Sequence, residues 1–225
     1  MVTVKSMSPI SWSAALLAAM AFSSPAVAAE RKPREVVEVT VAAVIGVLGN
    51  DALSKAEKRA GIEKIAYARF DFRTFTRLVT AKYWKRFSTE QKKAFFAEFK
   101  VFLAQEYGTR LDDYENQSVE VLDERVEPRG DVTVRTRIVG GDFDDASVDY
   151  RMRKKDDDWF VIDVVIEGVS LVSNWRDQFR EVLRGKNGVE DLLAQLRTKN
   201  KNREEGRGPP ASGPPAREGR PASKS

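Results

Sequence analysis

The stretch that most constrains the fold is DDWFVIDVVIEG, residues 157–168, because a strand formed from it would be apolar on both faces. Successive side chains of a strand point to opposite faces. The two faces hold Trp159, Val161 and Val165, and Phe160, Ile162, Val164 and Ile166. Neither face suits water, so a second covering element is needed. We expect it to be the helically spaced segment after Gly168, with Leu171, Val172, Trp175, Phe179 and Val182.

Three more strands are predicted before this one, because the apolar period changes to two. A first strand is expected at about 118–126, and the next two alternate inward and outward side chains. Their inward sets are Val132, Val134, Thr136 and Ile138, and Ala146, Val148, Tyr150 and Met152. Turns at 140–142 and 156–158 join neighbouring strands. The pattern predicts a four-stranded antiparallel meander.

The first half of the chain is predicted to be helical. Apolar side chains recur at helical spacing over 37–48, and 58–68 is a second, shorter candidate helix. Asp71 has the position of an N-cap, and Ser88 with Gln91 forms a capping box that opens a long helix. The body of the chain thus has a helical first half, a β middle and a helical end.

The two ends of the chain differ from its body. Residues 1–28 have the features of a secretory signal peptide: Lys5, an apolar run shorter than the roughly 20 residues of a membrane span, and an A-x-A site ending at Ala28. We therefore expect cleavage near Ala28 and export of the mature protein. Residues 199–225 are rich in Pro, Gly and basic side chains, which predicts a disordered tail. Residues 29–198 have the length of one domain.

The excess of basic over acidic side chains in the chain comes from that tail. The whole sequence has 38 Lys and Arg against 34 Asp and Glu, and residues 199–225 hold seven basic and three acidic side chains. The body is therefore close to neutral, which gives no argument for nucleic-acid binding.

Composition also restricts the chemistry. The chain has neither Cys nor His, so it has no disulfide and none of the usual Ser-His or Cys-His nucleophile arrangements. The acidic runs at 142–145 and 156–158 lack calcium-loop spacing and lie where hairpin turns are expected. We predict no metal, no cofactor and no enzymatic activity.

Large aromatic side chains are unusually frequent for a domain of this size. The set comprises Phe70, Phe72, Phe75, Tyr83, Trp84, Phe87, Phe95, Phe96, Phe99, Phe102, Trp159, Phe160, Trp175 and Phe179. Rings at helical spacing usually form a core, but a curved sheet and its helices can also enclose a pocket lined by them. Periodicity does not separate the two interpretations.

The runs FDFRTFTRLVTAKYWKRFSTEQKKAFFAEFKVFLAQEYGTRLDDY and DDWFVIDVVIEGVSLVSNWRDQFREVL, followed by NGVEDLLAQLRTK, resemble the MlaC family of periplasmic phospholipid-binding proteins. The family is also called the toluene-tolerance auxiliary component of an ABC transport system, and one branch is associated with hopanoids. The resemblance covers most of residues 36–199. It rests on Phe70-Asp71-Phe72, Tyr83-Trp84, Gln91, Phe99, Leu103, Tyr107, Tyr114, Glu167 to Leu171, Asn174, Trp175, Arg176 and Phe179.

The resemblance implies an α+β fold, with a twisted four-stranded antiparallel sheet wrapped by helices around an apolar lipid cavity. It also implies a carrier of phospholipid or hopanoid that moves between an outer-membrane lipoprotein complex and an inner-membrane MCE-domain ABC transporter complex. We expect the cavity wall to lie where the apolar faces of helices and sheet meet. Its predicted residues are Tyr83, Trp84, Phe99, Phe102, Val134, Tyr150, Trp159, Val165, Leu171, Val172 and Trp175.

Two other classes of protein stay open from the residues alone. One is an adaptor whose apolar faces all pack into a solid core. The other is a cone-shaped α+β enzyme with Asp163 as a buried general base. We favour a structural role for Asp163, as a carboxylate bonded to nearby backbone or to an arginine, because no second catalytic group converges on it in the sequence.

Overall fold

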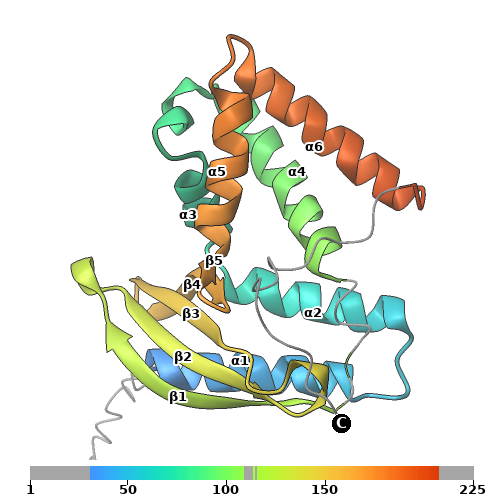
Figure 1. Ribbon diagram of the computed structural model, residues 1–225, viewed down its shortest axis with the longest axis vertical. Helices are drawn as coiled ribbons and strands as arrows, with labels where there is room; N and C mark the ends of the chain where they lie inside the picture. The colour runs from blue at the N-terminus through green and yellow to red at the C-terminus, as the bar shows by residue number, and fades with distance from the viewer. Residues whose placement is uncertain (1–30, 109–113, 115, 208–225) are drawn as a thin grey trace, which may run out of the picture.

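The computed structural model describes residues 31–108, 114 and 116–207. Its described part is α+β, as predicted, with six α-helices and one antiparallel sheet. Helix α1 lies along the sheet, and α3 to α6 form a separate helical layer on the β4–β5 side (Figure 1). The helices are α1 (Pro33–Leu48), α2 (Lys55–Arg69), α3 (Phe72–Thr80), the 3₁₀ turn η1 (Ala81–Arg86), α4 (Thr89–Gly108), α5 (Leu171–Leu183) and α6 (Gly188–Glu204). The strands are β1 (Ser118–Val126), β2 (Val132–Val139), β3 (Val148–Lys155), β4 (Asp158–Ile166) and β5 (Val169–Ser170).

Local capping explains where several helices begin. Asp71 accepts a hydrogen bond from the Thr74 backbone N–H at 3.0 Å, so it is the N-cap of α3. The Ser88 and Gln91 capping box is also present, with both reciprocal bonds formed. A second capping box, between Ser54 and Glu57, opens α2 three residues earlier than the apolar pattern predicts.

The sheet has five strands in the order β1-β2-β3-β4-β5, so the predicted count of four is wrong. Glu167 and Gly168 both adopt positive φ, 50° and 80°, and turn the chain sharply back on itself. Val169 then pairs with Ile166, and Ser170 pairs with Val165, before α5 begins. A strand of two residues has no measurable alternation, so the sequence pattern could not reveal it.

A bulge in β4 changes which residues share a face. Arg151 of β3 pairs with Asp163, whereas the next residue, Met152, pairs with Val161, so Ile162 has no partner. One extra residue shifts the alternation beyond it. Val161 and Val164 are buried in one core cluster, and Trp159 and Ile166 pack against the same cluster. The predicted grouping of Val165 with Trp159 is therefore not observed.

Two hydrophobic cores cover the apolar faces. In the sheet core, Val36 and Val37 of α1 pack on Val134, Met152 and Val161. Helix α1 thus supplies a cover that we expected from α5. Helix α5 contacts β4 near the start of the helix, but most of its apolar side chains enter the helical core with those of α3, α4 and α6.

Helix α6 continues to Glu204, past residue 199 where the tail is predicted to begin. Asn200 is buried, and its Nδ2 donates to the backbone oxygen of Glu98 at 3.0 Å and to Glu98 Oε2 at 2.9 Å. Residues 199–204 therefore belong to the helical layer. The predicted signal peptide, 1–28, and residues 208–225 of the predicted tail lie outside the described residues. Within the ranges that are described, none of the helices combines the length and the hydropathy of a bilayer span.

Candidate functional site

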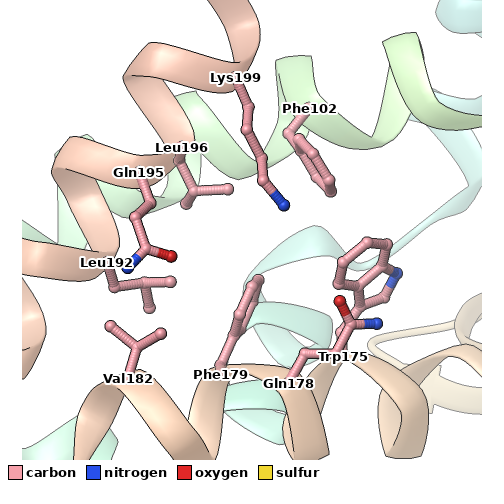
Figure 2. A pocket seen from close by; sticks show the side chains of 9 residues that line it. All are labelled: Phe102, Trp175, Gln178, Phe179, Val182, Leu192, Gln195, Leu196 and Lys199. Atoms are coloured by element: carbon pink, nitrogen blue, oxygen red, sulfur yellow. The ribbon is translucent and has the colours of Figure 1, made fainter. Parts of the chain in front are cut away.

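A pocket of about 110 Å³ lies between α4, α5 and α6 (Figure 2). All three helices contribute side chains, which project into the space where α5 and α6 diverge. The lining residues are Phe102, Trp175, Gln178, Phe179, Val182, Leu192, Gln195, Leu196 and Lys199.

The inner wall of the pocket is aromatic and aliphatic. Trp175 and Phe179 are four residues apart on α5, and Leu192 and Leu196 are four apart on α6, so each pair lies on one helix face. Phe102 of α4 meets Trp175 edge to face, with ring centroids 5.0 Å apart. The Trp175 indole N–H donates to the Tyr107 hydroxyl at 3.2 Å, which fixes the orientation of that ring. The α4 and α5 side of the inner wall is therefore held by contacts between aromatic rings and by this hydrogen bond.

The rim of the pocket is polar. Gln178 projects from α5 and Gln195 from α6, and the ammonium of Lys199, also on α6, points into the space between the helices (Figure 2). Lys199 Nζ lies 5.5 Å from the centroid of the Phe102 ring, a cation–π contact. Lys199 carries the one formal charge among the nine lining residues. This arrangement suits a ligand with an apolar end and a polar or anionic head.

The residues predicted to form a cavity wall are distributed over the pocket and the two hydrophobic cores. Phe102 and Trp175 line the pocket. Five others belong to the helical core or pack against it: Tyr83, Trp84, Phe99, Leu171 and Val172. Val134, Tyr150 and Trp159 are in or against the sheet core, where burial raises the pKa of Tyr150 to about 12. Val165 is half-buried on β4 beside Ser170.

The remaining lining residues escaped the sequence analysis for different reasons. Phe179 and Val182 carried a signal, since they follow Trp175 at helical spacing. Leu192 and Leu196 show the same spacing, but a single apolar stripe does not reveal which neighbouring helix it meets. Lys199 lies in the segment predicted to be a disordered tail, and the two glutamines show no distinguishing pattern.

Asp163 is fully engaged in structural contacts. Its Oδ2 accepts a hydrogen bond from the Ser170 hydroxyl at 2.5 Å and lies 3.5 Å from Arg151 Nη1. Its Oδ1 accepts from the backbone N–H of Val172 at 3.0 Å. The structural role is confirmed, and neither oxygen faces an open site for general-base chemistry.

The acidic runs serve turns. Asp144 Oδ1 accepts from the Gly140 N–H at 2.7 Å, which closes the loop between β2 and β3. Across the described ranges, no group of three or more acidic side chains is arranged to hold a metal ion.

The family model described as "MlaC protein" matches residues 38–198. The chain is 27% identical over 107 residues to the toluene tolerance protein ttg2D of Pseudomonas putida, covering 48% of this chain and 50% of that protein. It is 27% identical over 124 residues to the intermembrane phospholipid transport system binding protein MlaC of Haemophilus influenzae, covering 52% and 56%. The chain thus spans about half the length of these relatives.

One solved structure has the same fold. It is a phospholipid-binding protein of Ralstonia solanacearum, determined in complex with a phospholipid. The match has a TM-score of 0.69 at 24% identity, and it covers 76% of this chain and 98% of that one. At this identity the similarity concerns the fold.

Proposed function

The chain belongs to the MlaC family, and from this premise we propose that it is a periplasmic carrier of phospholipid or hopanoid. In this proposal residues 1–28 direct export. Residues 29–198 bind the lipid and pass it between an outer-membrane lipoprotein complex and an inner-membrane MCE-domain ABC transporter complex. The observation that carries the proposal is the family match, which spans the sheet, the helical layer and eight of the nine lining residues of the pocket.

The pocket supports the proposal as an entry point for an acyl chain. A dry cavity of about 150 Å³ accepts benzene, so one of 110 Å³ has room for roughly four carbons. Burying four methylene groups stabilises a complex by about 3 kcal/mol. The chain end would contact Phe102, Trp175 and Phe179, while the polar rim would remain at the water boundary.

A whole lipid needs more space, since ligand pockets generally measure about 300–1,000 Å³. Helix α6 is the wall that we propose moves, because the pocket lies along the α5–α6 interface and α6 is joined to α5 by a short turn. Movement of α6 away from Phe102 and Phe179 would extend the apolar wall into the helical core. The structure then corresponds to a closed state.

Such a carrier needs no covalent chemistry. An acyl chain gains about as much on entering a bilayer as on entering an apolar protein cavity. Transfer between the two is therefore close to neutral, and the docking partners determine its direction. The lack of Cys and His is compatible with this role.

Extraction of the purified protein with organic solvent, followed by mass spectrometry, tests the proposal. We expect co-purifying phospholipid or hopanoid. Val182→Trp should fill the pocket from its half-buried position on α5 and reduce the lipid content, whereas Val39→Trp, on the exposed side of α1, should not. Both variants should keep the circular dichroism of the wild type. Equal lipid content in the two variants would remove this pocket from the proposal.

An adaptor with a solid core is the second candidate, because nine of the eleven predicted wall residues lie outside the pocket. In that case the wild-type protein should yield no stoichiometric lipid on extraction. Its apolar faces would then serve packing alone.

A further inference from the structure

One end of the helical layer carries a cluster of cations around two aromatic rings. We call it the tip patch and define it as Lys82, Tyr83, Trp84, Lys85, Arg86, Lys92 and Lys186. It is formed by η1, the first turn of α4 and the α5–α6 turn, at the end of the molecule far from the sheet (Figure 1). Ala81, with φ 46°, ends α3 and turns the chain into η1, so that Lys82 and Lys85 are exposed.

Hydrogen bonds between separate segments hold this patch together. Arg86 Nη1 donates to the backbone oxygen of Leu183 at 2.5 Å, and its Nη2 donates to that of Gly185 at 3.0 Å. These bonds join η1 to the α5–α6 turn and bring Lys186 beside it. Gln91 adds a bond to Glu190 at 2.7 Å. The patch is therefore a fixed surface made from three separate parts of the chain.

The η1 and α4 parts of this surface have an excess of positive charge, whereas the α5–α6 turn is mixed, with Glu181, Glu190 and Asp191 against Arg184 and Lys186. From residue 73 to residue 93 the sequence has one acidic side chain, Glu90, and seven basic ones: Arg73, Arg77, Lys82, Lys85, Arg86, Lys92 and Lys93. Among the residues that the structure describes, no carboxylate forms an ion pair with Lys82, Lys85 or Lys92. The positive charge is thus available to an external anionic partner.

Two half-buried rings are interleaved with these cations. Lys82 Nζ lies 5.3 Å and the Arg86 guanidinium 5.7 Å from the Tyr83 ring centroid, and Lys92 Nζ lies 5.5 Å from that of Trp84. Each ring packs against the helical core and leaves part of its surface exposed. Aromatic rings with one apolar and one wet side, next to lysine and arginine, are typical of surfaces that bind anionic membranes.

We propose that the tip patch docks this protein on the headgroups of an anionic phospholipid bilayer. The cations attract the surface, and Tyr83 and Trp84 sit at headgroup depth. This goes beyond the proposed carrier function, which names protein complexes as partners, and it does not require lipid in the pocket. A contact at the tip leaves the sheet and α1 free.

Vesicle sedimentation with the purified full chain tests the proposal. The probes are vesicles of phosphatidylcholine alone and vesicles with phosphatidylglycerol added. The wild type should bind the anionic vesicles at low salt and lose that binding as salt screens the charges. Lys82→Glu with Lys85→Glu should reduce binding about 25-fold or more, since each lysine near an anionic surface contributes about fivefold. Lys55→Glu with Lys64→Glu on α2 changes the net charge equally and should leave binding near the wild-type value.

Three results would overturn the proposal. The first is equal binding to neutral and anionic vesicles. The second is an equal loss in both double variants, since net charge alone would then explain the binding. The third is no binding by the wild type to either kind of vesicle, in which case an acidic protein surface would be the candidate partner of the patch. Circular dichroism of both variants confirms that each has folded, and lipid extraction reports separately on the carrier function.

Discussion

The carboxylate of Asp163, buried in β4, accepts a hydrogen bond from the backbone N–H of Val172 in the first turn of α5, at 3.0 Å. A strand side chain thus satisfies a free N–H of a helix N-terminus, beside Ser170, the N-cap. Leu171, between Ser170 and Val172 in the sequence, packs against both hydrophobic cores. The junction between sheet and helical layer is therefore fixed by one charged group.

Asp163→Asn should weaken this junction. The amide keeps the shape of the carboxylate but brings donor hydrogens toward the Ser170 hydroxyl or the Val172 N–H, and it removes the charge facing Arg151. Loss of a hydrogen bond to a buried charged group costs about 2 kcal/mol. Urea unfolding should show that decrease, and Asp157→Asn, at an exposed turn position, should show almost none. Equal stability of the two variants would contradict a capping role for Asp163.

Val172→Glu should prevent or strongly weaken folding. The side chain is 3% exposed, belongs to the helical core and does not line the pocket. An unpaired buried charge destabilises a protein by about 3 kcal/mol or more. Thermal unfolding followed by circular dichroism measures the effect. Ser173→Glu, one residue later and exposed, is the control and should fold normally. A folded Val172→Glu protein lacking lipid would instead place Val172 at a ligand site.

The two ends of the predicted tail should differ in their effect on stability. A chain ending at Thr198 loses the bonds from Asn200 to Glu98 and the ion pair between Arg203 and Glu106, and so leaves the buried Glu106 carboxylate unpaired. Removing one partner of a buried pair costs roughly 3–5 kcal/mol. A chain ending at Arg207 keeps these contacts and should unfold at the wild-type temperature. A large decrease in its melting temperature would show that residues 208–225 support the fold.

The N-cap of α3 should make stability depend on pH in the acid range. Partial burial raises the pKa of Asp71, but hydrogen bonds from Thr74 and the charge of Lys155 outweigh it and hold the pKa below 3.8. A lowered folded pKa stabilises the protein above the ordinary value and loses that effect as pH falls through the folded value. Asp71→Asn keeps a good N-cap without the titration. In urea unfolding, the free energy by which the wild type is more stable than Asp71→Asn should therefore decrease below pH 3.8. A difference in stability that does not change with pH would argue against this assignment.

Much of the fold was predictable because it depends on local signals. The capping box at Ser88 and the N-cap at Asp71 use side chains that bond to backbone three residues away. The α+β class, the alternation along β2 and β3 and the family resemblance likewise come from residues close in sequence. The structural role of Asp163 was also predictable, because an acid among apolar neighbours needs hydrogen-bond donors.

Other features required the tertiary structure, because they depend on which apolar surfaces meet. Valine and phenylalanine at helical or strand spacing show that a face is buried. Because the hydrophobic effect is not directional, the pattern does not specify which other element packs against that face. Only the structure shows that α1 covers the sheet, that the β4 bulge moves Val164 and Ile166 to the face of Trp159, and that Phe99 packs in a core while Phe102 borders a pocket. Lys199 and Asn200 likewise belong to the helical layer because their side chains contact α4, at Phe102 and Glu98. Helix α6 therefore extends beyond the end that the sequence predicts.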